Sequence, residues 1–181
     1  MLPRWLKQHS ELLYQNPWWT YRKDIVAVPG FGQHDYHYAE TNGSSMVVPL
    51  SQQNTLILVN QFRYLGDKES LEFPCGGVKP KHSHLQTAYL ELAEETGFKA
   101  TQMEPIGAFN PWNGVAKETC QVYLATGLKP TDAKADPTEE LECYEFTPDE
   151  LDQLIRQGRI WDGMTLATWV LARQHVLNSL P

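Results

Sequence analysis

The sequence predicts a fold of the α/β (α+β) class, in which helices cover a mixed sheet on both sides. Two observations support this prediction. Short apolar runs are separated by Gly, Asn and Asp turn signals, as in hairpins, and three segments begin with helix-capping residues. The mixture of hairpins with crossing helices favours a sandwich. With 181 residues and 41% hydrophobic content, the chain is long enough for one well-buried domain and short for two.

Composition excludes several classes of partner. The net charge of −7 argues against binding to nucleic-acid polymers or to anionic membrane surfaces. The three cysteines show no CxxC spacing, which indicates a reducing compartment and neither a disulfide framework nor a zinc site. No apolar run is long enough for a signal peptide or a membrane span. We therefore expect a cytoplasmic protein.

The N-terminal region, residues 1–45, is rich in aromatic residues. Residues 1–15 predict a short amphipathic helix, whose apolar side carries Trp5, Leu6, Leu12 and Leu13. A strand should follow, led by Trp18, Trp19 and Tyr21, with a hairpin turn at Gly30–Gly32 and a returning strand over 36–40. These aromatic side chains either pack in the core, stack on a base or form a dimer contact.

The central part of the chain contains the apolar runs. Asn42-Gly43 is a turn signal, and the runs 46–50 and 55–60 predict a hairpin in a central sheet. Further strands are expected over 119–126 and 141–146, with a loop over 106–118 next to the site and a long polar loop over 127–140. Arg63, between two aromatic residues, either clamps a diphosphate or is an ordinary surface residue.

Three helices are predicted from capping residues. Ser83 and Gln86 form a capping box before a helix over 84–96, which Gly97 ends. Its expected buried stripe consists of Leu85, Ala88, Tyr89, Leu92 and Thr96. Thr147 caps a second helix that ends near Gly158, and Asp162 caps a last one. The packing face of the last helix is expected to carry Met164, Ala167, Val170 and Leu171.

The first helix also carries three carboxylates, Glu91, Glu94 and Glu95, at spacing i, i+3 and i+4. Like charges at this spacing destabilise a helix by roughly 0.2–0.5 kcal/mol per pair. Mg²⁺ or Mn²⁺ would relieve this repulsion, because such cations prefer carboxylate ligands. The alternative is a solvated acidic face. The preceding Gly76-Gly77 turn favours a site, because it places accessible backbone next to the acids.

This segment resembles the Nudix box, the signature of the Nudix hydrolase superfamily. The matching positions are Gly76, Glu91, Leu92, Glu94, Glu95, Gly97 and Phe98. Two positions differ: His82 stands at the first acidic position, and Leu90 stands at that of an arginine which helps to hold the metal glutamates in the family. The resemblance implies a Nudix-type α/β/α sandwich over residues 46–181.

The resemblance extends along the chain. ESLEFPCGG, FNPWNGVAKE, the EELE segment and GRIWDGMTLA are similar to segments of the ADP-ribose and nucleoside-diphosphate-sugar pyrophosphatase branch. The similarity implies a pyrophosphohydrolase that uses Mg²⁺ or Mn²⁺ and cleaves the diphosphate of a nucleoside diphosphate sugar. It also implies a homodimer that exchanges N-terminal strands from residues 1–45. Asn113 occupies a position where ADP-ribose pyrophosphatases typically carry proline, so strict ADP-ribose preference is not implied.

The same resemblance implies roles for particular residues. The metal ligands would be the Cys75 carbonyl, Glu91 and Glu95, with Glu94 beside them. A loop carboxylate, Glu139 or Glu140, would position or deprotonate the attacking water. The expected substrate-binding residues are Trp19, Arg63, Glu72, Gly76 and Glu118.

Two other functions are compatible with the box. His82 and Leu90 are consistent with a Nudix domain that has lost hydrolysis and binds a nucleotide sugar as a sensor or regulator. Hydrolysis of damaged nucleoside triphosphates uses the same box, but the flanking segments resemble the sugar-diphosphate branch. His82 and His84 are expected to be loop residues near the helix start, since two histidines alone form no recognised metal site.

Overall fold

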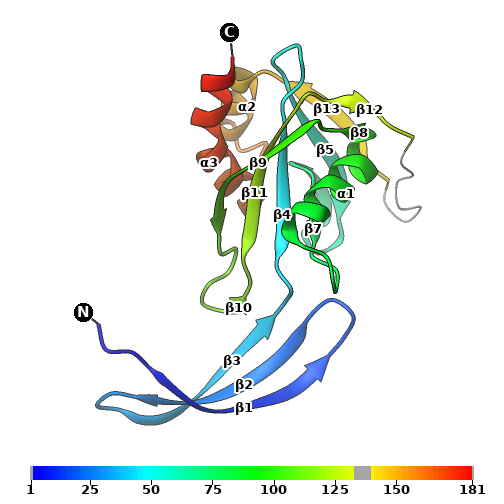
Figure 1. Ribbon diagram of the computed structural model, residues 1–181. Coiled ribbons are helices and arrows are strands. Elements are labelled where there is room, and N and C mark those ends of the chain that lie inside the picture. Colours follow the sequence, from blue (N-terminus) through cyan, green and yellow to red (C-terminus); the bar gives the residue numbers. More distant parts are fainter. Residues whose placement is uncertain (1, 133–139, 181) are drawn as a thin grey trace. The chain divides into compact units, whose positions relative to one another are not determined.

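The computed structural model describes residues 2–132 and 140–180 and shows a mixed α+β chain (Figure 1). The predicted fold class is confirmed. The chain divides into two compact units: Met1–Asn42 with Asn110–Thr119 form unit 1, and Gly43–Phe109 with Cys120–Pro181 form unit 2. No helix within the described ranges is both long and apolar enough to cross a membrane.

Unit 1 is a four-stranded sheet in the order β1-β2-β3-β10. Its strands are β1 (Leu6–Gln15), β2 (Thr20–Val28), β3 (Gly32–Glu40) and β10 (Ala116–Lys117). β1, β2 and β3 pair antiparallel, whereas β10 runs parallel to β3. The hairpin turn predicted between β2 and β3 is confirmed, since Gly30 and Gly32 adopt φ of +82° and +84°.

The prediction of a helix over residues 1–15 was wrong, because residues 6–15 form β1. β1 pairs with β2 along its whole length, from Leu6 opposite Ala27 to Gln15 opposite Thr20. A cross-strand ion pair between Lys23 and Glu11, at 2.9 Å, adds to this ladder. Pairing with β2 thus decides the conformation of a segment whose own helical periodicity is weak.

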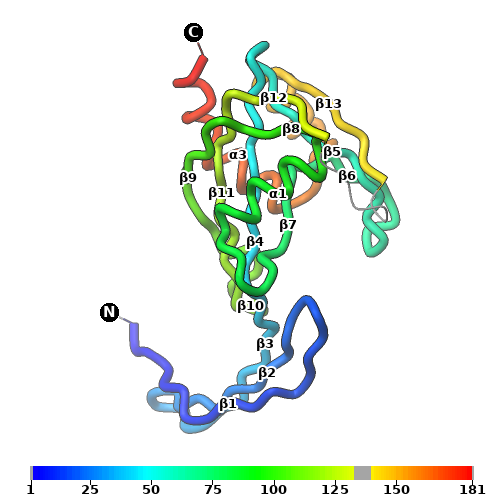
Figure 2. Tube along the Cα trace, turned by 45° about the vertical axis from the view of Figure 1, so that its right-hand side comes forward, coloured from blue at the N-terminus to red at the C-terminus, as the bar shows by residue number. Residues whose placement is uncertain are grey.

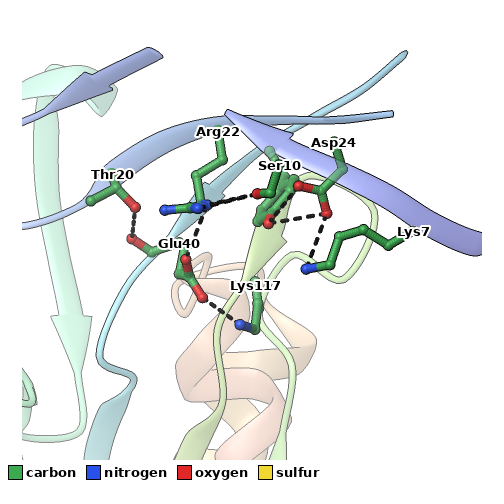
Figure 3. Close-up of polar contacts among 8 residues, drawn as sticks. Lys7, Ser10, Thr20, Arg22, Asp24, Glu40 and Lys117 are labelled. Carbon is green, nitrogen blue, oxygen red and sulfur yellow. Dashed lines mark hydrogen bonds and ion pairs between the residues drawn. The ribbon is translucent and has the colours of Figure 1, made fainter. Parts of the chain in front are cut away.

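A polar network links the four strands β1, β2, β3 and β10 of unit 1 (Figure 3). Arg22 in β2 donates to Ser10 Oγ in β1 at 3.1 Å and lies 3.6 Å from the Glu40 carboxylate in β3. Lys117 in β10 also pairs with Glu40. Because each partner comes from a different strand, these contacts help to fix the register of the sheet.

Buried Asp24 belongs to the same network (Figure 3). Its carboxylate accepts a hydrogen bond from Tyr38 at 3.3 Å and lies 3.5 Å from Lys7 Nζ. Burial raises the pKa of Asp24, but a hydrogen bond from Ser10 and the charge of Lys7 outweigh it and hold that pKa below its usual range. The carboxylate therefore stays ionised at neutral pH.

Among its described residues, unit 2 contains three sheets and three α-helices. The mixed sheet has the order β7-β4-β11-β9, with strands β4 (Ser44–Pro49), β7 (Cys75–Gly77), β9 (Gln102–Phe109) and β11 (Cys120–Thr126). An antiparallel sheet has the order β13-β5-β6, with strands β5 (Leu56–Arg63), β6 (Lys68–Glu72) and β13 (Glu142–Phe146). The shorter elements are η1 (Tyr64–Gly66), β8 (Phe98–Lys99) and β12 (Lys129–Pro130), of which β8 and β12 pair.

The apolar runs 46–50 and 55–60 form strands β4 and β5, but they lie in different sheets, so the predicted hairpin in one sheet was wrong. β4 is flanked by β7 and β11, and β5 is flanked by β6 and β13. With both edges of each strand occupied, only the bridge between Leu50 and Leu56 joins them. The predicted strands over 119–126 and 141–146 are confirmed as β11 and β13.

The helices of unit 2 lie on both faces of the mixed sheet (Figure 2). They are α1 (His84–Thr96), α2 (Pro148–Arg156) and α3 (Gly163–Ser179). On one face α1 packs through Ala88 and Leu92 on Val47, and on the other α2 and α3 pack on Met46 and Val48. All three predicted caps, Ser83, Thr147 and Asp162, accept backbone hydrogen bonds.

The buried faces of α1 and α3 differ from those predicted. In α1, Leu85 and Tyr89 are exposed, and Thr87 and Glu95 are buried with Ala88, Leu92 and Thr96. In α3, Val170 is exposed, and the buried residues are Thr165, Thr168, Trp169, Ala172 and Val176. Burial of polar residues is possible here because most find partners: Thr165 Oγ1 accepts from the Phe73 amide, and Trp169 Nε1 donates to Asp152.

Candidate active site

The site is built where β7 runs beside α1. In β7, Cys75, Gly76 and Gly77 pair with Met46, Ser45 and Ser44 of β4. Fully buried Ser45 donates through Oγ to the His84 carbonyl at 2.9 Å. His84 Nδ1 lies 3.0 Å from the Ser44 carbonyl, an acceptor only, so Nδ1 carries the hydrogen.

These contacts attach the N-terminus of α1 to β4. The predicted helix start at His84 is confirmed, whereas the expectation that His84 is a loop residue was wrong, and sequence reasoning missed the contacts by which His84 anchors α1. The available signal was the pair Ser44-Ser45 directly before the apolar run 46–50. A polar pair at the start of a buried strand needs hydrogen-bond partners nearby.

Glu91 lies against the backbone of Gly76. A Cβ added to Gly76 would stand 2.1 Å from both Cδ and Oε1 of Glu91, far inside any allowed contact. Gly76 has no left-handed φ, so space rather than backbone conformation explains the glycine. The bare backbone thus leaves room for one carboxylate of the box.

Glu95, one helical turn further along α1, is held from the same strand. Its side chain is buried, and Oε2 accepts a hydrogen bond from the Cys75 amide at 3.1 Å. A buried carboxylate needs such donors, because an ionised group without them is costly to remove from water. Glu94 is half-buried on the same helix. The structure therefore brings Glu91 and Glu95 to the Cys75–Gly76 backbone.

Arg63 and Glu72 form an ion pair in the β5-β6 sheet. Arg63 Nε donates to Glu72 Oε1 at 2.8 Å, and Nη2 donates to Oε2, so the pair is bidentate. Glu72 is buried, whereas nearly half of the Arg63 side chain is exposed. The hydrogen bond to Glu72 raises the pKa of Arg63 above its already high value. Arg63 is thus a fixed cation with exposed surface.

The thiols near these carboxylates are neutral. A hydrogen bond with Cys120, then burial and the charge of Glu95, raise the pKa of the Cys75 thiol well above its usual value. Burial and Glu95 likewise raise the pKa of Cys143, whose Sγ donates to the Glu95 carbonyl at 3.5 Å. The charge of Glu95, the lesser contribution to both shifts, would also favour a nearby cation.

The donor set fits a hard divalent cation. Within residues 2–132 and 140–180, no three His, Cys, Asp or Glu side chains already form a metal cluster. The side chains that lie along the Cys75–Gly76 backbone are the Glu91 and Glu95 carboxylates, which offer oxygen ligands. Mg²⁺ and Mn²⁺ prefer such donors.

The remaining predicted residues are Trp19, Glu118, Glu139 and Glu140. Trp19 and Glu118 belong to unit 1, where the Trp19 amide donates to Asn16 Oδ1 at 2.8 Å, and the Glu118 carbonyl accepts from the Asn110 side chain. Glu140 is exposed in the segment before β13. Glu139 lies outside the described residues.

Comparison with known proteins identifies the class of this site. The model of the NUDIX domain family matches residues 41–167, so the chain belongs to that family and the resemblance inferred from the box is confirmed.

Three similar proteins extend this result. A methanol dehydrogenase activator from Bacillus methanolicus is 34% identical over 158 residues, which cover 86% of this chain and 85% of that protein. An ADP-ribose pyrophosphatase from Bacillus subtilis is 30% identical over 125 residues, 68% of each chain. The crystal structure of an ADP compounds hydrolase superposes with a TM-score of 0.86 at 19% identity and covers 98% of this chain and 97% of its own, which supports the fold.

Proposed function

We propose that this protein is a divalent-metal-dependent pyrophosphohydrolase of nucleoside diphosphate sugars such as ADP-ribose or GDP-mannose. Its products would be a nucleoside monophosphate and a sugar phosphate. The observation that carries the proposal is the convergence of Glu91 and Glu95 on the Cys75–Gly76 backbone at the Nudix box.

The chemistry requires charge neutralisation, because the anionic oxygens of a diphosphate repel a nucleophile. A divalent cation neutralises part of this negative charge and lowers the pKa of a water molecule bound to it. Glu91, Glu95 and the Cys75 carbonyl would hold the cation, with Glu94 beside them. Glu139 or Glu140 would orient or deprotonate the attacking water. The chain itself contributes positioning and electrostatics.

Substrate recognition would use the exposed face of Arg63. Its guanidinium, oriented by Glu72, is suited to contact phosphate oxygens. Gly76 would let the substrate approach the backbone, and Glu118 and Trp19 would contact the nucleoside or sugar. The half-exposed ring of Trp19 is supported by Tyr14, with ring centroids 5.9 Å apart.

We further propose a homodimer with exchanged N-terminal strands, in which residues 1–45 are the dimer contact and residues 46–181 the hydrolase domain. The support is the number of exposed aromatic side chains in unit 1: Trp5, Trp18, Trp19, Tyr21, Phe31 and Tyr36. Apolar surface of this kind marks interaction sites. The three free cysteines support a reducing compartment, the cytoplasm.

The test is a turnover assay with Mg²⁺ on ADP-ribose, GDP-mannose, UDP-glucose, a dinucleoside polyphosphate and several triphosphates. An added phosphatase releases phosphate from the monoester products. We expect turnover of diphosphate sugars that a chelator abolishes. Turnover of triphosphates alone would contradict the proposal and favour nucleotide housecleaning.

A second candidate is a Nudix domain that binds a nucleotide sugar as a regulator without cleaving it. Leu90 and His82 at box positions support it, and so does similarity to a relative named as an activator. Tight calorimetric binding of ADP-ribose, with no turnover of any compound in the panel, would favour this candidate.

A further inference from the structure

A cavity lies in unit 2, on the β13-β5-β6 sheet and apart from the box carboxylates. Its volume is about 840 Å³, within the range of small-molecule sites. Its lining includes aromatic rings, an amide, a carboxylate and two cations: Phe62, Tyr144, Phe146, Asn60, Glu69, Arg159 and Lys68, whose Nζ lies 4.2 Å from the centroid of the Trp161 ring.

Strand register places this cavity on the opposite face of the sheet from the candidate active site. Asn60 pairs with Leu71 and Phe62 pairs with Glu69, so these side chains share a face. Val59 and Glu72, which also pair, point to the other face. The Arg63–Glu72 ion pair is therefore separated from the cavity by the strands themselves.

The aromatic side chains provide a stacking surface. Tyr144 and Phe146 stack at 6.4 Å between centroids, with an angle of 21° between their planes. Phe62 is 59% exposed, although burial in the core would be the ordinary place for such a ring. An exposed phenylalanine at the wall of a cavity is suited to stack on a planar ligand.

The polar groups complement both ends of a nucleotide. Glu69 and Asn60 are joined by a hydrogen bond of 3.1 Å, which orients a carboxylate that can accept N–H donors from a base. Arg159 has no acidic partner among the residues that the structure describes. A guanidinium binds phosphate through paired hydrogen bonds.

We propose that this cavity is a second ligand site, which binds a nucleoside monophosphate with its base on Phe62 and its phosphate on Arg159. The site stands independently of the proposed hydrolysis, because it uses none of the residues assigned to metal or diphosphate binding. Tight binding needs both the base and the phosphate of the ligand, because the aromatic stacking surface recognises the base and the guanidinium recognises the phosphate.

The test is calorimetric titration of the whole protein with AMP, with a chelator present to remove divalent cations from the box. We expect AMP to bind, and adenosine and ribose 5-phosphate each to bind at least about tenfold more weakly. Arg159→Gln and Phe62→Ala should each weaken AMP binding by about tenfold or more, because each removes one recognition element.

Two matched variants separate this site from the candidate active site. Arg156→Gln removes the same charge from an exposed position on α2 outside the cavity lining, and Glu95→Gln alters the box; both should retain AMP binding. Loss of binding in Glu95→Gln with retention in Arg159→Gln would overturn the proposal, as would absence of binding to the wild type. Unchanged thermal unfolding of Arg159→Gln confirms that its effect is local.

Discussion

Gly76→Ala tests whether the Glu91 carboxylate must lie against bare backbone. The added Cβ would stand 2.1 Å from Glu91 Oε1, whereas ordinary contact begins at 3.4 Å, so the carboxylate must move by at least the difference of about 1.3 Å. Glu91 is a flexible side chain, and Gly76 has no left-handed φ, so the substitution displaces the carboxylate without straining the backbone. We therefore expect the variant to fold.

The functional cost should be large. A misplacement of about 1 Å in a catalytic constellation costs on the order of a hundredfold in rate. We expect kcat/KM on the best diphosphate sugar to fall by about that factor, together with weaker Mg²⁺ activation, because the displaced group is a proposed metal ligand.

Gly77→Ala is the matched control. It makes the same change one residue later in β7, where an added Cβ meets nothing within 4 Å and φ is not left-handed. The assay compares turnover and Mg²⁺ dependence of both variants, with thermal unfolding as a check on folding. If Gly76→Ala turns over as well as Gly77→Ala, the placement of Glu91 at the metal is refuted.

Three further predictions concern other contacts. Glu95→Gln should lose most of its turnover while its thermal midpoint stays close to that of the wild type; wild-type turnover would remove Glu95 from the metal site. Arg63→Lys keeps the positive charge but loses the bidentate hydrogen bonds to Glu72 that orient the side chain. We therefore expect KM to rise by about tenfold, with a smaller change in kcat. An unchanged KM would mean that Arg63 does not contact the substrate. Asp152→Asn removes the ion pair with Arg173, 2.8 Å long, and should lower the thermal midpoint at pH 7 by about 2–4 °C. Arg173 lowers the pKa of Asp152 in the folded state. The difference in thermal midpoint between the wild type and Asp152→Asn should therefore be fully present above the ordinary carboxyl pKa, and it should vanish as the pH falls through the pKa of Asp152 in the folded protein. A difference in thermal midpoint that persists in strong acid would contradict this prediction.

Local signals in the sequence predicted the three helices of unit 2 and the strands β4, β5, β11 and β13, whereas residues 106–109, expected in a loop, belong to β9. Capping residues marked the starts of α1, α2 and α3 correctly, because caps satisfy backbone donors within one turn. Sheet membership could not be predicted in the same way. The separation of β4 and β5 into two sheets depends on β11 and β13, which follow more than 55 residues later.

The candidate site was predictable in composition but not in arrangement. The spacing of Glu91 and Glu95 indicated carboxylates on one helical face. It did not indicate that Glu95 would be buried with Ala88 and Leu92, because the expected buried stripe included no carboxylate. The Cys75 amide makes this burial possible, and its position depends on pairing between β7 and β4.

This arrangement also explains how the box can carry Leu90 where the family has arginine. The contacts that orient Glu91 and Glu95 come from the backbone of β7: the space over Gly76 and the amide of Cys75. Neither contact uses the Cys75 side chain. Gly76 is different, since any side chain there would occupy the position of the Glu91 carboxylate. The glycine, rather than residue 90, is therefore the sequence position on which the geometry of this site depends most directly.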